Sequence, residues 1–395
     1  MKRVYILGAC RTPIGKMGGA LSSLSAIDLG AIVIKEAILR SKVPADQVDH
    51  VYMGCVIQAG LGQNVARQAS LKAGLPVTTT AQTINIVCGS GLDAVNCAAR
   101  LINSGEADIV VAGGMESMSN APFAIMNGRY GYKMGSPMIN TPLIDTMVND
   151  GLWDAINNFH MGITAENVAE KWHITREELD QFAAESQSKA SLAISNGLFR
   201  DEIVPIKTKE RKTEIVIDTD EGPRPETTVE VLARLKPAFK ENGIVTAGNS
   251  SGINDGAAAV VMASEDKIIE LELQPLVEWI GGALGGVSPE LMGIGPIEST
   301  NKLLKKTSMT MNEIDLVEAN EAFAAQSLVV QRELGIPDEK MNINGGAIAL
   351  GHPIGASGCR ILVTLIHAMR RRQAKTGLAT LCIGGGMGCS TIVRR

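Results

Sequence analysis

Three residues in glycine-rich stretches have side chains that could carry out thiol chemistry. Cys88 lies in "TINIVCGSGLDAV", between an apolar run and a Gly-Ser-Gly that begins an amphipathic helical pattern. His352 lies in "GHPIGASG" (351–358), and Cys382 begins "CIGGGMG". The free N–H groups and the dipole of a helix start favour a thiolate, and a histidine that accepts the thiol proton activates a cysteine nucleophile. Taken singly, each residue could equally be structural, because cysteine is among the most often buried residue types.

A loose internal repeat places these residues in related surroundings. The stretches 83–102 and 343–366 each run from a predicted strand through a glycine turn into a predicted helix. Each is followed by an apolar run that ends in glycines, "ADIVVAGGM" (107–115) and "LATLCIGGGM" (378–387). A long-period repeat of this kind indicates two copies of one α/β unit. Equivalent turns in the two copies would bring Cys88 and His352 to the same end of two related sheets.

The composition between the two copies is different. Residues 119–246 hold nine of the thirteen aromatic residues, and Thr175 and Glu178 form a capping-box pattern before a helix that we expect to stop near Gly197. We interpret this segment as an inserted substrate-binding region. The predicted division is an N-terminal half at 1–118, the insertion at 119–246, a return of the N-terminal half at 247–270 through "VTAGNSSGINDGAAAVVMAS" (245–264), and a C-terminal half at 271–395.

Composition narrows the classes of protein. The 395 residues are 45% hydrophobic and 20% charged, with a formal net charge of −5 and no basic block, which argues against nucleic acid as a partner. No apolar run reaches the length of a membrane span. The seven cysteines include no C-x-x-C pair, and the five histidines show no metal-ligand spacing, so we expect no metal and a reduced, cytoplasmic protein.

Eight short motifs occur in order along essentially the whole chain: "RTPIG" (11–15), "VCGSG" (87–91), "GGMESMS" (113–119), "HMGITAEN" (160–167), "NSSGINDGAA" (249–258), "NEAFAAQ" (320–326), "NGGAIALGHPIGASG" (344–358) and "CIGGGMG" (382–388). With these motifs the chain resembles the thiolases, and most of all their acetoacetyl-CoA thiolase branch. The resemblance implies an α/β fold of two similar βαβ-type halves, a five-layered α/β/α/β/α core, and an inserted loop domain that binds coenzyme A.

The resemblance also implies catalytic roles. Cys88 would carry the acetyl group as a thioester, and His352 would accept its proton. Cys382 would be the base that removes a proton from the methyl group of a second acetyl-CoA. His352 and a water held by Asn320 would bind the enolate oxygen, and the backbone N–H groups of Cys88 and Gly384 would form a second oxyanion site. The expected reaction is the reversible condensation of two acetyl-CoA molecules to acetoacetyl-CoA and CoA.

Further positions match the family's coenzyme A site. Coenzyme A would be substrate and product, with no other cofactor, and Met292 would close the acyl end of the pocket. The family also implies a homotetramer bridged by residues near 119–140. The matching positions are His160, Met161, Arg224, Phe239, Ala247, Ser251, Met292, Ala322 and Phe323.

One departure from the family concerns the surroundings of Cys88. Ile86 stands where the family often has a basic residue, and Asp93 falls in the first helical turn after the cysteine. An acid in the pocket would disfavour the thiolate. We expect Asp93 to point outward, because Leu92 and Val95 take the apolar face.

Four other functions compete with this interpretation. A degradative 3-ketoacyl-CoA thiolase of broader chain length stays the main alternative. A decarboxylating ketoacyl synthase shares the fold but needs no cysteine base, and a non-catalytic lipid-binding relative would not keep both cysteines, His352 and Asn320 together. A dinucleotide-dependent dehydrogenase is excluded because no G-x-G-x-x-G follows a first strand.

Overall fold

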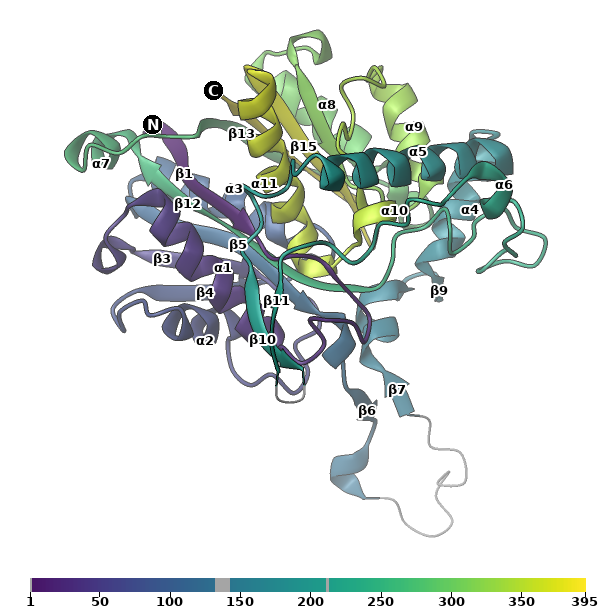
Figure 1. Ribbon diagram of the computed structural model, residues 1–395, viewed down its shortest axis with the longest axis horizontal. Coiled ribbons are helices and arrows are strands. Elements are labelled where there is room, and N and C mark those ends of the chain that lie inside the picture. Colours follow the sequence, from purple (N-terminus) through teal and green to yellow (C-terminus); the bar gives the residue numbers. More distant parts are fainter. Residues whose placement is uncertain (1, 132–142, 211–212) are drawn as a thin grey trace.

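Ten strands in the described part of the chain form one mixed β-sheet. The computed structural model describes residues 2–131, 143–210 and 213–395 (Figure 1). The strand order is β14-β15-β16-β13-β1-β12-β5-β3-β4, and β2 pairs with β12. The bounds are β1 Val4–Arg11, β2 Gly15–Lys16, β3 His50–Gly54, β4 Thr80–Ile84, β5 Ile109–Ser117, β12 Asn254–Ser264, β13 Val277–Gly286, β14 Leu316–Ala319, β15 Thr376–Ile383 and β16 Met387–Arg394.

The sheet consists of two halves that meet at one short junction. The first half contains β4, β3, β5, β12 and β1, and the second contains β14, β15, β16 and β13. They are joined by three antiparallel partners between β1 and β13, including Tyr5 opposite Glu278. In both halves the outer pairs are parallel (β4 with β3 and β3 with β5 in the first, β14 with β15 in the second), and the inner pairs are antiparallel.

Helices cover both halves on each side and produce five layers. α3 (Ser90–Ser104) and α11 (Ile354–Arg372) lie in the middle and pack in one core with residues of both sheet halves. α1 (Ala26–Ser41) and α2 (Val65–Lys72) cover the outer face of the first half. α8 (Gly295–Thr307) and α9 (Ala324–Leu334) cover that of the second. The expected α/β/α/β/α architecture is confirmed (Figure 1).

β12 shows why the apolar runs form buried strands. All eleven of its residues are buried, and successive side chains alternate between the two cores: Val260 packs with the central helices and Val261 with α1. A strand covered on both faces has no polar face, so its sequence is an almost continuous apolar run. The return of the chain to the sheet within 245–264 is therefore as expected, while the exact domain boundaries at 118, 246 and 270 stay predictions.

Two glycines let the central helices approach each other closely. A Cβ on Gly358 would lie 2.4 Å from the backbone nitrogen of Leu92, and one on Gly91 would lie 2.9 Å from the carbonyl oxygen of Gly355. The first turns of α3 and α11 therefore pack backbone against backbone, which no other residue type allows without a shift. This contact brings together the two loops that precede the helices, and these loops carry Cys88 and His352.

The predicted strand at the start of the second repeat is wrong. Met341 makes only an isolated bridge with Val317, and the chain then turns into the short helix α10 (Ala347–Leu350). The backbone N–H groups of Gly346 and Ile348 donate to Ser186 Oγ and Glu321 Oε2 instead of to a neighbouring strand. The backbone turns at Asn342 and Gly345, which have φ +45° and +78°, so no strand continues beyond Met341.

The inserted segment packs mostly against the second half. α5 begins with the predicted capping box of Thr175 and Glu178, and Gly197 follows its end with φ +67°. α4 contacts Met292, Phe323 and the sheet end at Cys382 in one apolar cluster. The remaining elements are β6 Phe123–Ile125, β7 Leu143–Asp145, β8 Trp153–Asp154, β9 Phe159–His160, α4 Met161–Lys171, α5 Arg176–Ser195, β10 Ile206–Glu210, β11 Thr213–Ile217, α6 Val229–Leu232 and α7 Glu265–Glu270.

A buried ion cluster holds the insertion to the first half. Arg11, at the end of β1, is fully buried and donates to Glu202 Oε1 at 2.6 Å and to both oxygens of Asp220 at 2.7 and 2.9 Å. Both acids belong to the inserted segment. A buried guanidinium needs such partners because an unpaired buried charge is strongly destabilising, so the arginine of "RTPIG" has a structural role.

Candidate active site

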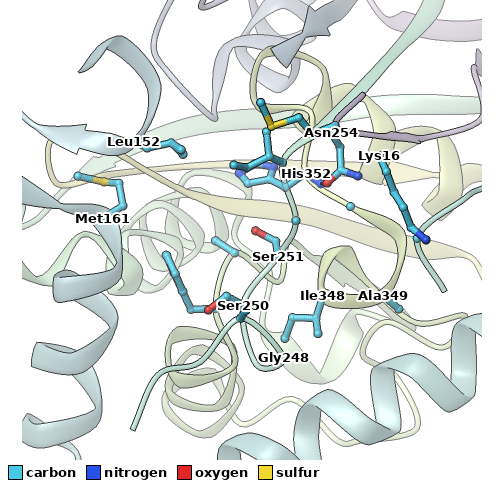
Figure 2. Close-up of a pocket in the computed structure, with 18 of the residues that line it drawn as sticks. Lys16, Leu152, Met161, Gly248, Ser250, Ser251, Asn254, Ile348, Ala349 and His352 are labelled. Carbon is cyan, nitrogen blue, oxygen red and sulfur yellow. The ribbon is translucent and has the colours of Figure 1, made fainter. Parts of the chain in front are cut away.

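A cavity of about 800 Å³ lies where the N-terminal ends of α3 and α11 meet. Cys88, His352 and Cys382 all line it. Figure 2 shows His352 beside Asn254, with Met161 and Leu152 on one side of the cavity and Lys16 on the other. The three residues that the sequence singled out for thiol chemistry thus share one cavity, although they come from three distant parts of the chain.

A strained turn presents Cys88 to this cavity. Val87 has φ +51°, a conformation that is rare for a β-branched residue. Ser90 stabilises the turn, because its hydroxyl donates to the carbonyl of Val87 at 2.6 Å and accepts the N–H of Ile86 at 3.0 Å. Asn85 Oδ1 accepts the N–H of Val87 at 3.0 Å. Such strain is typical of functional sites, where the surrounding contacts compensate it.

Burial of Cys88 opposes the thiolate expected at the start of this helix. Burial raises the pKa of Cys88 to about 11, against the opposing effect of the backbone N–H groups of Gly384 and of Cys88 itself. The N–H groups of Gly89 and Ser90 instead bond to the carbonyls of Ile86 and Val87, so they are not directed at the sulfur. Cys88 rests as a thiol and needs a base. The two N–H groups near its sulfur are those predicted for an oxyanion site.

His352 is arranged to be that base. Ser357 donates its hydroxyl to the carbonyl of Pro353 at 2.9 Å, so it accepts a hydrogen bond from Nδ1 of His352 at 2.5 Å. This places the ring proton on Nδ1 and leaves Nε2, which has no hydrogen-bond partner among the described residues, as the acceptor. Burial, assisted by the positive charge of Arg360, lowers the pKa of His352 to about 3. A neutral imidazole therefore faces a neutral thiol.

Two residues that the sequence analysis did not single out hold the His352 loop. Asn254 accepts the N–H of His352 at 2.9 Å and donates to the carbonyl of Gly15 at 2.9 Å. Glu116 is fully buried and accepts the N–H of Gly355 at 2.9 Å together with two N–H groups of residues 56–57. Both residues lie inside motifs quoted for the family resemblance, so the motifs were the signal that could have found them.

Asn320 lies behind His352 and is not part of the cavity lining. Its amide nitrogen is 3.5 Å from Nδ1 of His352, and its oxygen accepts a hydrogen bond from Arg360 Nη2 at 3.4 Å. The structure thus brings Asn320 next to the predicted base, while the predicted role in holding a water stays a prediction.

Cys382 lies at the end of β15 and is buried at the bottom of the cavity. Burial, and to a smaller extent the negative charge of the nearby Cys88 thiolate, raises the pKa of Cys382 well above its usual range. The turn after it contains Gly385 and Gly386 at φ +87° and +85°. These two glycines are therefore required by the backbone conformation.

All nine residues predicted to contact coenzyme A line the cavity: His160, Met161, Arg224, Phe239, Ala247, Ser251, Met292, Ala322 and Phe323. An aromatic wall forms part of this lining. His160 stacks on Phe239 at 4.8 Å between ring centroids, and Phe323 meets Phe239 edge-on at 6.0 Å. Nδ1 of His160 accepts the N–H of Gly162 at 3.0 Å, so Nε2 carries the proton and can donate to a ligand.

A second cation in the lining was missed. Lys16 joins Arg224 in the lining and directly follows the quoted "RTPIG". The side chain of Gln187 supports Arg224 by accepting its backbone N–H at 2.8 Å. Two cations beside a lining that is mostly apolar but includes the acid Glu226 suit a ligand with a charged end and an apolar chain.

The departures noted near Cys88 do not place a charge in the cavity. Asp93 is directed away from the cavity, and its Oδ1 pairs with Arg100 Nη2 at 2.8 Å. Its Oδ2 accepts a hydrogen bond from Cys97 Sγ at 3.7 Å. This direction away from the cavity is as expected, although the side chain of Asp93 is buried. Ile86 packs against the central core.

The described residues contain neither a membrane-spanning helix nor a cluster of metal ligands. None of their helices combines the length and apolar character needed to cross a membrane. Within the same ranges, no group of three or more histidine, cysteine or acidic side chains is arranged to hold a metal ion.

Comparison with known sequences decides the family. The sequence profile of the thiolase N-terminal domain matches residues 4–266, and that of the thiolase C-terminal domain matches residues 273–395. The chain belongs to the thiolase family. Among curated relatives of this thiolase, an acetyl-CoA acetyltransferase of Syntrophomonas wolfei is 56% identical over 394 residues, which is 99% of each chain.

Solved structures agree with this assignment. The acetyl-CoA acetyltransferase of Bacillus anthracis has a TM-score of 0.97 and 45% identity to the thiolase, with 100% of this chain and 99% of the other covered. Human mitochondrial 3-ketoacyl-CoA thiolase has a TM-score of 0.96 and 43% identity at the same coverage.

The electrostatics of the thiolase site predict how Cys88 reacts with an alkylating agent. Because its pKa lies near 11, the thiolate fraction and the rate of iodoacetamide alkylation should rise about tenfold per pH unit between pH 6 and 9. Peptide mapping at each pH would follow Cys88 separately from Cys97, the other partly exposed cysteine. A rate that is already constant above pH 7 would indicate a preformed thiolate–imidazolium pair and contradict this description.

Proposed function

We propose that this thiolase is an acetyl-CoA C-acetyltransferase that condenses two acetyl-CoA molecules to acetoacetyl-CoA and CoA, reversibly, through an acetyl thioester on Cys88. The observation that carries the proposal is the meeting of Cys88, unpartnered Nε2 of His352, and Cys382 in one cavity. A ketoacyl synthase would not need the second cysteine. The curated relatives named acetyl-CoA acetyltransferase support the same function.

In the first half-reaction Cys88 becomes acetylated. Nε2 of His352 takes the thiol proton as the sulfur attacks the thioester carbon. The oxyanion that forms is directed toward the N–H groups of Cys88 and Gly384, which already lie near the sulfur. The C–S bond to coenzyme A breaks, and Cys382 gives its proton to the departing CoA sulfur.

In the second half-reaction a new acetyl-CoA is condensed with the acetyl group. The Cys382 thiolate removes a proton from the methyl carbon, and the electron pair is delocalised onto the thioester oxygen as an enolate. The protonated His352 donates from Nε2 to this oxygen. The enolate carbon then attacks the acetyl carbon, and the Cys88 thiolate leaves. The proton on His352 returns to Cys88.

The cavity also orients coenzyme A in this proposal. Lys16 and Arg224 would contact its phosphates, because cations bind phosphate oxygens, and the apolar wall of His160, Phe239 and Phe323 would contact the pantetheine. Coenzyme A is substrate and product here, and the mechanism uses no other cofactor.

The substrate should be short. Met292 lines the cavity and is 3% exposed, so its side chain occupies space that a longer acyl chain would need. We expect thiolysis of acetoacetyl-CoA to be strongly preferred to that of 3-ketohexanoyl-CoA, measured as kcat/KM in a thioester assay. Met292→Ala should narrow this preference by about 10–200-fold, because a pocket discriminates by ~1–3 kcal/mol per methylene.

The chain-length assay also separates the two thiolase functions. Comparable kcat/KM values on acetoacetyl-CoA and on a C8 ketoacyl-CoA would contradict the proposal and favour a 3-ketoacyl-CoA thiolase, the name of the similar human structure. Absence of both activities would contradict a thiolase reaction altogether.

The oligomer and the location belong to the same proposal. β6 and β7 form an arm that projects from the body (Figure 1), and Phe123, Ile125 and Leu143 on it are 55–63% exposed. Large exposed apolar side chains on an arm are best buried against another copy, which supports a homotetramer. Part of the predicted bridging loop falls in 132–142, outside the described residues. A cytoplasmic location fits the free thiols of all seven cysteines.

A further inference from the structure

Gln326 has a side-chain amide whose orientation is determined by its neighbours. It lies in the first turn of α9 and is 1% exposed. Its Oε1 accepts the N–H of Ala322 at 3.2 Å, and its Nε2 donates to Ser327 Oγ at 3.1 Å. The Ser327 hydroxyl donates in turn to the carbonyl of Phe323, so it can only accept from Gln326. The oxygen and the nitrogen of the amide therefore cannot exchange places.

This fixed oxygen is directed at Cys382. Oε1 of Gln326 lies 3.6 Å from Cys382 Sγ, within the range of a hydrogen bond from a thiol. The backbone at Gly293 packs directly against Gln326 and limits its movement. A Cβ on Gly293 would lie only 2.5 Å from Cβ of Gln326. No mechanistic step described above uses this contact.

An amide oxygen distinguishes the two protonation states of a cysteine. It accepts a hydrogen bond from S–H, but its partial negative charge repels a thiolate. Next to Gln326, Cys382 is therefore favoured as a thiol with its S–H directed away from the substrate and a sulfur lone pair left for the cavity. Once Cys382 has lost its proton, the same oxygen makes the thiolate less stable and a stronger base.

We propose that Gln326 is a positioning residue for Cys382: it orients the S–H of the thiol and makes the thiolate that persists between the half-reactions a stronger base. The inference rests on the proposed function. When the Cys382 thiolate takes a methyl proton from acetyl-CoA, the C–H bond breaks, the S–H bond forms, and the electron pair stays on the substrate as the enolate. The new S–H then bonds to Oε1 of Gln326, which stabilises the protonated Cys382 while the enolate carbon attacks the acetyl carbon.

The test separates acetylation from proton abstraction. Gln326→Met keeps the length of the side chain and removes the acceptor, and Gln331→Met makes the same change further along α9, where Gln331 bonds to Asp338 and does not line the cavity. Labelled acetyl-CoA measures the acetylation burst on Cys88, and deuterium exchange into the methyl group of acetyl-CoA measures proton abstraction.

We expect Gln326→Met to keep the size of the burst and the KM but to lower the rate of exchange about tenfold or more. This is a fraction of the ~10²–10⁴-fold decrease in rate that follows removal of a whole acid–base group. Gln331→Met should change neither rate.

The outcomes distinguish this inference from the proposed function. If the wild-type enzyme neither acetylates Cys88 nor exchanges methyl protons, the proposed function fails. If the wild type does both and Gln326→Met exchanges like Gln331→Met, or loses burst and exchange equally, only the role of Gln326 fails.

A spectroscopic measurement on the folded wild-type enzyme keeps the test independent of the stability of the variant. The infrared S–H stretch of Cys382, assigned by difference from Cys382→Ala, should lie at the lower frequency of a hydrogen-bonded thiol. A band at the frequency of a free thiol would overturn the inference.

Discussion

Cys88→Ser should abolish both half-reactions, with a loss of condensation of at least about 10⁴-fold, because the covalent route itself is removed. Serine keeps the size of the side chain and the hydrogen-bonding turn, but its hydroxyl is far less acidic than a thiol, and the neutral His352 is a weak base because burial holds its pKa near 3. The measurement is trapping of labelled acetyl-enzyme after mixing with acetyl-CoA, together with steady-state condensation.

The control for this variant is Cys97→Ser, which changes the other partly exposed cysteine outside the cavity lining. It should trap as much label as the wild type. Retained turnover in Cys88→Ser, with label on the peptide that contains Cys382, would reverse the roles assigned to the two cysteines.

Cys382→Ser should still accept the acetyl group on Cys88 but fail to condense it. Burial keeps Cys382 away from solvent at the bottom of the cavity, where a serine hydroxyl is too weak an acid to exchange protons in place of a thiol. Loss of a positioned acid–base group typically lowers a rate ~10²–10⁴-fold. We therefore expect a stable labelled thioester on the Cys88 peptide and condensation lower by this factor.

The chemical nature of the label on Cys382→Ser enzyme tests the roles assigned to the two cysteines. A thiol added to labelled Cys382→Ser enzyme should release the acetyl group, which shows that it is a thioester. Failure of Cys382→Ser to acquire label at all would mean that Cys382 is needed for acetylation beyond protonating coenzyme A, and the division of roles would be wrong.

Local patterns in the sequence were sufficient for several elements. The capping box of Thr175 and Glu178 and the glycine stop after α5 depend on residues three or four positions apart, so they are visible without a fold. β12 is an apolar run long enough to predict a buried strand. The predicted strand near residue 343 does not form because the backbone turns at Asn342 and Gly345, and side chains from distant parts of the chain, Ser186 and Glu321, bond to the N–H groups that follow this turn.

The sequence by itself determined the family, and the resemblance to that family implied the five-layered architecture and many of the residues that line the cavity, because ordered motifs are properties of neighbouring positions. Only the tertiary structure decided the protonation states and the supports of the site. The pKa of Cys88 is set mainly by desolvation, which depends on every segment packed around the sulfur. The tautomer of His352 follows from Ser357 and Pro353, and the contact of Cys382 with Gln326 joins β15 to α9. Burial and hydrogen-bond direction arise when distant segments meet, so no local pattern contains them.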